Sequence, residues 1–293
     1  MFGAGTLDLH HHLLDLAEAM RPLPATVSKL AAVIADETSQ IEDVSSIIRE
    51  DPSLIAALLR ESNSAASAPA NEIVTVEAAV MRLGLARVLA IATASSLGSE
   101  TQKPLAAYDL AAGDLWSHSI VCSYVAETIY RLSPAQVGAE VVTAALLHDI
   151  GQIVLDNVLD HDQFVLARAA NVRVTTAERE LVEVDHAELG ALLLELWDIP
   201  RSITNAVRFH HDPEASLGEL PAHVVFVANV VGHELDLDDE DSPDHDDLDE
   251  PDEATAVAEA QLETSLELLD VDHDELLERS RKALVRAGLR EDD

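Results

Sequence analysis

The sequence predicts an all-α protein built from many short helices. Apolar residues recur at the three- and four-residue spacing of one helix face, as at Val44, Ile47 and Ile48. No segment shows a convincing apolar–polar alternation of the kind that predicts a strand, and 11 glycines and 11 prolines are few for a chain rich in β-turns. Aromatic residues make up only 3% of the chain, so aliphatic side chains must form the core.

Helix start and stop signals divide the first hundred residues. Apolar faces predict helices near residues 30–34 and 41–48. Asp51 is placed to cap the next helix, with Pro52 as its first residue and an end near Asn63. Two more helices are expected, one from the cap Thr75 to the stop Gly84 and one over residues 86–97.

The second half predicts longer helices, beginning with residues 115–132. Ser133 and Gln136 form a capping-box pattern, so we expect a helix to start there and run to Leu147. A further helix is expected to start at His148-Asp149 and continue through Leu155. The remaining predicted helices cover 186–197, 201–211, 220–235 and 254–268, followed by a last helix capped by Asp272.

The charge is strongly negative, −37 from 55 acidic and 18 basic residues. Such a surface repels phosphate backbones and anionic lipids, so we expect no direct binding to nucleic acid or membranes. Either a salt-adapted cytoplasm or a GC-rich genome accounts for this composition. Residues 234–253 include thirteen acidic residues and predict a disordered insert, because like charges repel and proline interrupts helices. A calcium loop is the alternative, but the required D-x-D-x-D-G spacing is absent.

The N-terminus and the cysteine content predict a soluble, cytoplasmic protein. The first residues carry neither a basic region nor a long apolar run, so no signal peptide is expected. Cys122 is the only cysteine, which excludes an internal disulfide and suits a buried thiol. Residues 1–19 predict an amphipathic N-terminal helix that includes His10-His11-His12, either a partly exposed metal-binding cluster or the remnant of a tag.

Histidines and one His-Asp pair are the residues that point to chemistry. No phosphate-binding loop, C-x-x-C pair or H-E-x-x-H helix is present. Neutral imidazole and carboxylate bind divalent transition metals, and such a metal can lower the pKa of its bound water to about 7. The candidate residues are His118, His148, Asp149, His186, His210 and His211.

Each candidate also has a purely structural interpretation. His118 can place a polar tip at a helix-packing seam, and His148 can bond a nearby carbonyl. Asp149 can cap the helix that follows it. Neighbouring helix positions point about 100° apart, so His148 and Asp149 share one ion only at a helix junction. His210 and His211 can form a polar helix end where the dipole favours cations.

Several motifs in a fixed order resemble the HD-related output domains, the HDOD family of the HD and HD-GYP phosphohydrolase superfamily. The segment LLHDIG at 146–151 resembles the superfamily signature. Further matches are WSHS at 116–119, H-x-x-x-G at 186–190, W-x-I-P at 197–200 and HH-x-P at 210–213. In the first half, LP at 23–24, DP-x-L at 51–54, NS at 63–64 and the LG helix at 78–84 resemble the family's N-terminal part.

The resemblance implies an HDOD-like all-α fold over residues 20–233. An N-terminal helical bundle over about 20–104 would pack on an HD-like helical core over about 105–233. The acidic insert at 234–253 and C-terminal helices at 254–293 would follow.

The resemblance also implies a degenerate metal site. Catalytic relatives hold metal with residues that correspond to His118, His148 and Asp149. Their last aspartate corresponds to Asn229, a weaker neutral ligand, and Gln152 stands where a lysine is frequent. Both are expected beside the ligands rather than on the metal. His186, His210 and His211 would supplement the site, and no GYP motif follows them.

The function implied is regulatory: a non-catalytic bacterial signal-transduction domain that binds or scaffolds signalling proteins. It would also bind a nucleotide-like ligand without turnover. It would carry no cofactor, or a divalent ion such as Fe, Mn, Mg or Zn. The alternative is a metal-dependent phosphohydrolase acting on a nucleotide or cyclic dinucleotide. In that case His148 and Asp149 are the candidate catalytic residues.

Overall fold

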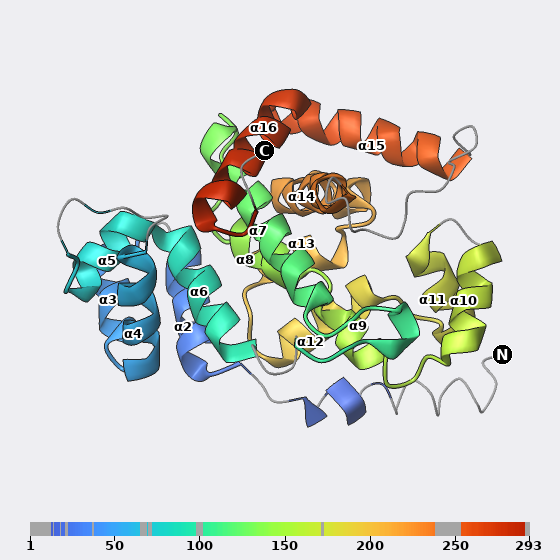
Figure 1. Cartoon of the computed structure of the whole chain (residues 1–293), viewed down its shortest axis with the longest axis horizontal. Helices are drawn as coiled ribbons and strands as arrows, with labels where there is room; N and C mark the ends of the chain where they lie inside the picture. Colours follow the sequence, from blue (N-terminus) through green and yellow to red (C-terminus); the bar gives the residue numbers. More distant parts are fainter. Residues whose placement is uncertain are drawn as a thin grey trace.

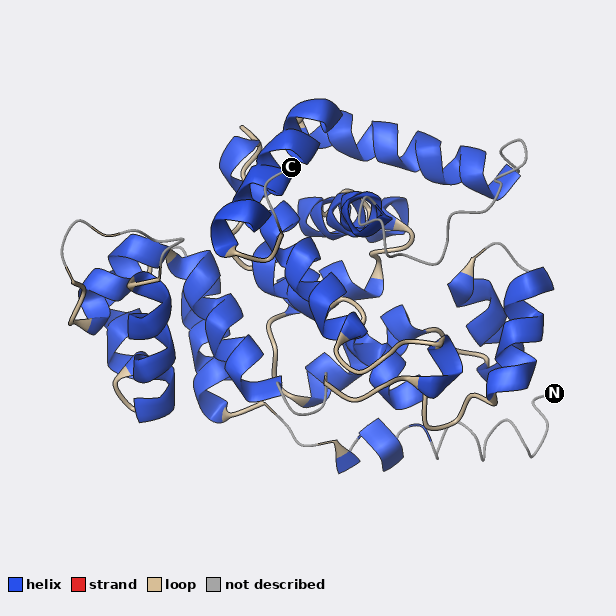
Figure 2. Cartoon of the chain, in the orientation of Figure 1, coloured by secondary structure: helices blue, strands red, loops and turns tan. Residues whose placement is uncertain are grey.

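Helices joined by short loops make up the described part of the chain (Figure 2). The computed structural model describes residues 13, 15–17, 19–20, 23–36, 38–64, 69, 72–97, 102–170, 173–237 and 253–290. Within these residues there is no strand, only an isolated antiparallel bridge between Leu105 and Leu110. The prediction of an all-α fold is therefore confirmed. The predicted histidine cluster His10-His11-His12 lies outside the described residues.

The N-terminal helices form one side of the molecule (Figure 1). They are α2 (Ala25–Ala35), α3 (Ile41–Ile48), α4 (Pro52–Ser62), α5 (Val76–Leu83) and α6 (Leu85–Leu97). The cap of α4 is as predicted, because the carboxylate of Asp51 accepts bonds from the backbone N–H groups of Ser53 and Leu54 at 2.9 and 3.1 Å. Gly84 ends α5 with a φ of 79°, which favours glycine. Helix α6 then packs against the central helix α8 (Val141–Leu147).

The central helices surround the region that holds the candidate site. Besides α8 they are α7 (Asp114–Leu132), α9 (Ile150–Leu155), α12 (His186–Leu196), α13 (Arg201–Arg208) and α14 (Leu220–Leu237). Helix α7 contacts α8 and α14, and α12 contacts α9 and α13. Their facing side chains are fully buried aliphatics such as Ile129, Leu147 and Leu193. Helix α13 ends three residues earlier than predicted, so His210 and His211 follow it in a turn.

The predicted helix start at Ser133 is wrong. Helix α7 ends at Leu132 and the next helix begins only at Val141. The hydroxyl of Ser133 accepts a bond from the backbone N–H of Ala135, and it donates to the carbonyl oxygen of Leu269 at 2.6 Å. The capping pattern is therefore used in a loop that is tied to a distant helix end, a contact that local spacing does not encode.

Two helices that the sequence did not predict lie at the edge of the central helices (Figure 1). They are α10 (His161–Ala170) and α11 (Val174–Val182), which pack against each other. The apolar face of α10 is narrow, since Phe164 and Ala167 are the buried hydrophobics among its described side chains. Helix α11 matters to the site because it carries Glu178.

The acidic segment begins later than predicted. Helix α14 continues through Leu237, and Leu235 within it is buried, so residues 234–237 are helical rather than part of an insert. Residues 238–252 lie outside the described residues. The chain continues with α15 (Glu253–Leu269) and α16 (His273–Ala287), and the carboxylate of Asp272 caps α16 as predicted.

One hydrophobic core runs through the N-terminal and central helices. It is largely aliphatic, as the scarcity of aromatic residues predicts, and Cys122 is buried within it. Within the described residues, no single helix combines the length and apolar composition needed to cross a membrane, although the bent pair α5 and α6 meets both criteria together.

Candidate metal centre

The candidate site is built around a helix junction. His148 is the residue that ends α8, and Asp149 is the N-cap residue of α9. At this junction the two side chains converge, with His148 Nε2 3.3 Å from Asp149 Oδ2. The carboxylate of Asp149 does not cap its own helix. It is therefore free to face the imidazoles around it.

A close contact between two helices places His186 beside Asp149. A side chain at Gly151 on α9 would overlap the carbonyl oxygen of His186 and lie 2.8 Å from the amide nitrogen of Gly190 on α12. Only glycine permits this approach. His186 is the first residue of α12, and its Nε2 atom lies 3.1 Å from Asp149 Oδ1.

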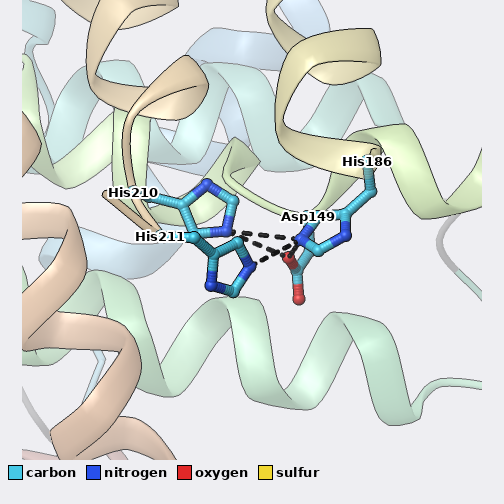
Figure 3. Close-up of side chains that lie close together, drawn as sticks. All are labelled: Asp149, His186, His210 and His211. Carbon is cyan, nitrogen blue, oxygen red and sulfur yellow. Dashed lines mark hydrogen bonds and ion pairs between the residues drawn. The ribbon is translucent and has the colours of Figure 1, made fainter. Parts of the chain in front are cut away.

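His210 and His211 complete the cluster from the end of α13 (Figure 3). His210 Nε2 lies 3.6 Å from Asp149 Oδ1, and His211 Nε2 lies 2.9 Å from His186 Nε2. The potential ligand atoms of Asp149, His186, His210 and His211 all lie within 4.8 Å of one another. A single ion can therefore be reached by one atom from each of four residues.

Hydrogen bonds on the outer ring nitrogens hold the imidazoles in one orientation. Nδ1 of His148 bonds the carbonyl oxygen of Ala145 at 2.8 Å, and Nδ1 of His210 bonds the carbonyl oxygen of Val207 at 2.7 Å. Because a carbonyl only accepts, both Nδ1 atoms must carry the proton. In the neutral rings the Nε2 lone pairs then point toward Asp149, the arrangement typical of metal-binding histidines.

Glu178 plays the same part for His186, although the sequence did not reveal it. Its carboxylate is fully buried and accepts from His186 Nδ1 at 2.8 Å and from the His186 backbone N–H at 3.0 Å. The hydroxyl of Tyr108 donates to the same carboxylate at 2.7 Å. No motif marks Glu178, because it lies eight residues before His186 on a helix that the periodicity did not predict.

The charges within the cluster are strongly coupled. Burial alone would raise the pKa of Asp149, but the facing His148 and His186 outweigh it and hold that pKa well below its usual range. Burial alone would lower the pKa of His186, but Glu178 and Asp149 hold it well above the ordinary value. Burial and the neighbouring imidazoles keep the pKa values of His210 and His211 well below theirs.

His118 extends the cluster from α7. Its ring lies 5.4 Å from the His148 ring, measured between centroids, and its Nε2 lies 3.0 Å from Asn229 Oδ1. A side chain at Gly232 would approach the Cys122 sulfur to 2.7 Å, so this glycine lets α14 pack directly against α7. His118 thus lies at a helix-packing seam, as its structural interpretation predicts, and also next to the candidate ligands.

A carboxylate that no sequence motif marks supports His118. Asp236 Oδ2 lies 2.8 Å from His118 Nδ1, and His233 stacks on the His118 ring at 4.3 Å. Asn229, His233 and Asp236 are spaced four and three residues apart, so they share one face of α14. That spacing is visible in the sequence, but Asp236 falls within the residues predicted to form the acidic insert.

The residues fit a divalent metal ion. His148 Nε2 is buried and makes no hydrogen bond, because with the ring proton on Nδ1 its lone pair faces the Asp149 carboxylate at 3.3 Å, which is costly unless a cation binds there. Imidazole nitrogens and a carboxylate oxygen together form a ligand set suited to transition metals. Metal binding would use the inward Nε2 atoms of His186 and His210, which lie 3.4 Å apart.

The structure brings all six candidate ligands into one continuous cluster, although their role as ligands stays a prediction. Asn229 lies against His118, as expected for a residue beside the ligands, and Gln152 is buried in α9 one turn from Asp149. The alternative for His210 and His211, cations favoured by a helix dipole, is disfavoured because their lowered pKa values keep both rings neutral.

Known proteins with the same arrangement of helices define the class. A family model described as "HDOD domain" matches residues 20–213. An HDOD domain protein of unknown function from Geobacter sulfurreducens superposes with a TM-score of 0.72 at 22% identity, over 98% of each chain. A candidate phosphohydrolase from Shewanella amazonensis gives 0.63 at 24% identity, over 95% of this chain and 98% of that one.

Two further relatives extend the comparison. A candidate signal-transduction protein from Marinobacter aquaeolei has a TM-score of 0.66 at 18% identity, over 97% of this chain and 65% of that one. An uncharacterized protein of Treponema pallidum is 24% identical over 71% of this chain, which spans only 40% of that protein's length. The chain belongs to the HDOD family.

Proposed function

We propose that this HDOD protein is a non-catalytic regulatory module of a bacterial signalling system, with a divalent metal ion held in its histidine cluster. The burial of the cluster carries the proposal. The exposed fractions of His210, His186 and Asp149 are 0%, 1% and 7%. A catalytic metal keeps a coordination position open to substrate, whereas here protein atoms surround the converging ligand atoms.

The chemistry of the ligand set limits which metal ion the cluster would bind. Magnesium prefers oxygen ligands and retains several waters, so a set dominated by imidazole favours Zn, Fe or Mn. When bound, such an ion would supply positive charge at Asp149 and cross-link the α8–α9 junction, the start of α12 and the end of α13. Asp149, His186, His210 and His211 are the residues that would hold it, with Glu178 orienting His186.

Binding of signalling proteins is the second part of the proposal. It is supported by the family and by the name of the Marinobacter aquaeolei neighbour. The partners are proposed only as a class, signalling proteins.

Metal content and turnover, measured on the same untagged protein, test the proposal. We expect about one Zn, Fe or Mn ion per chain, lost in His186→Ala and retained in His161→Ala, whose imidazole is exposed outside the cluster. Neither the unaltered protein nor the two variants should hydrolyse bis(p-nitrophenyl) phosphate or a cyclic dinucleotide after addition of Mn²⁺ or Fe²⁺.

The two contrary outcomes are separable. Hydrolysis that disappears in Asp149→Asn would overturn the non-catalytic assignment and establish a phosphohydrolase. A protein that stays metal-free after reconstitution would exclude the metal, and the cluster would then be a hydrogen-bonded core.

A further inference from the structure

A second concave site lies away from the histidine cluster, between the N-terminal helices, α7 and α16. It has a volume of about 880 Å³, within the range of small-molecule sites. Its walls come from the ends of α4 and α5, the start of α6, the second half of α7 and one face of α16. None of its lining residues belongs to the candidate metal centre, so its function does not depend on the metal.

Positive charge is concentrated in this groove. The lining includes six of the chain's 18 basic side chains but only four of its 55 acidic ones. The rest of the chain is therefore even more acidic than the chain as a whole. The six basic residues are Arg82, Arg87, Arg131, Arg279, Lys282 and Arg286. Arg82, Arg131 and Arg286 lie in the last turns of their helices, where the dipole favours cations. That effect explains the residue type but not the convergence of three helices on one groove.

Arg87 is a preorganised anchor on the groove wall. Its guanidinium lies over the Tyr124 ring, 4.1 Å from the centroid, and also bonds the Tyr124 hydroxyl. Glu61 lies 3.5 Å away, and only 16% of the Arg87 side chain is exposed. A guanidinium held in one orientation presents its forked N–H donors to an anion with little further loss of entropy.

Three of the other cations, Arg279 and Lys282 among them, are held by surface pairs with a carboxylate one turn away on the same helix. Lys282 pairs with Glu278 and Arg279 with Glu275, each one turn apart on α16, and the two basic side chains are 61% and 54% exposed. Exposed pairs of this kind contribute little to stability. An anion with two or more charges can therefore displace a single carboxylate at small cost.

We infer that this groove binds a small anion that carries two or more phosphate groups. A compact ligand satisfies the clustered guanidinium and ammonium groups within the available volume. A long polyanion, such as an acidic peptide or nucleic acid, would extend beyond the groove and be repelled by the acidic residues that dominate the rest of the chain. The charge pattern thus selects for a short, highly charged ligand.

Calorimetry with inorganic triphosphate tests the inference on protein freed of metal with EDTA, which removes binding through the histidine cluster. We expect saturable binding that weakens with salt, and an affinity about tenfold or more lower in Arg279→Gln/Lys282→Gln. The matched control is Arg49→Gln/Lys29→Gln, which removes one arginine and one lysine from exposed pairs outside the groove. Its affinity should stay within about twofold of the unaltered protein.

Three results would overturn the inference: no binding of triphosphate, equal losses in the groove and control variants, or tighter binding of an oligo-aspartate peptide than of triphosphate. A nucleoside triphosphate is the last probe. Binding tighter than that of inorganic triphosphate supports the site and identifies a nucleotide as the source, whereas equal binding supports a site for the phosphates alone. Because the metal is absent, failure here leaves the metal proposal untouched.

Discussion

Replacing Gly151 by alanine is the most direct perturbation of the packing that assembles the histidine cluster. The added Cβ would overlap the carbonyl oxygen of His186 and lie 2.8 Å from the amide nitrogen of Gly190. Both obstacles are backbone atoms, so no side-chain rotation relieves the clash. Helices α9 and α12 must separate, or the first turn of α9 must distort.

The expected magnitude follows from two opposing effects. In an unpacked helix, alanine stabilises relative to glycine by about 0.5–1 kcal/mol. Overpacking in a well-packed core costs about 1–3 kcal/mol. We expect the clash to dominate, lowering the free energy of unfolding by about 1–2 kcal/mol. Because α9 begins at Asp149 and α12 begins at His186, separation of these helices should also weaken metal binding.

Urea unfolding followed by circular dichroism measures the stability, and metal titration measures the affinity. Gly138→Ala is the matched control, because the three atoms nearest to its Cβ belong to the carboxylate end of Glu140, which can rotate away. The control should change stability by less than about 0.5 kcal/mol. A Gly151→Ala protein as stable as the unaltered one would refute the close packing of α9 on α12.

Three further predictions concern the residues around the cluster and one helix cap. Glu178→Gln should weaken metal affinity by about 10- to 100-fold, because the carboxylate orients His186. Equilibrium competition with a chelator dye measures the metal affinity, and an unchanged affinity would contradict the orienting role of Glu178. Metal binding near pH 7 should release about one proton, because His186 has a raised pKa and must lose its proton to bind the metal; metal affinity should therefore fall as the pH drops. Calorimetry in buffers of different ionisation enthalpy counts the released protons, and the absence of release would argue against His186 as a ligand. Asp51→Ala should destabilise the protein by about 1 kcal/mol in urea unfolding, since it removes both bonds that cap α4.

Local signals in the sequence predicted most helices. Apolar spacing located α3, α4 and α7, and the caps Asp51 and Asp272 bond as their residue types predict. These features depend on residues within one or two turns of each other. Periodicity failed at α10 and α11, where few apolar residues are buried, and the capping pattern at Ser133 failed because its hydroxyl bonds a distant helix end.

The candidate site was predicted in its residues but not in its arrangement. Motif order selected His118, His148, Asp149 and the later histidines. It did not reveal Glu178 or Asp236, the two carboxylates that orient His186 and His118. Each lies outside the matching motifs, and its importance arises from a contact across helices.

The sequence by itself determined the helical class, most helix boundaries and the kinds of side chain available for metal binding, because these depend on short-range spacing and on chemistry. Tertiary structure alone decided which atoms meet. Glycine contacts set the distance between α9 and α12, and buried acceptors set the orientation of each imidazole. It also gathered six basic residues from four helices into one groove of an acidic protein. Such convergence is a property of packing between distant segments, which no local pattern in the chain records.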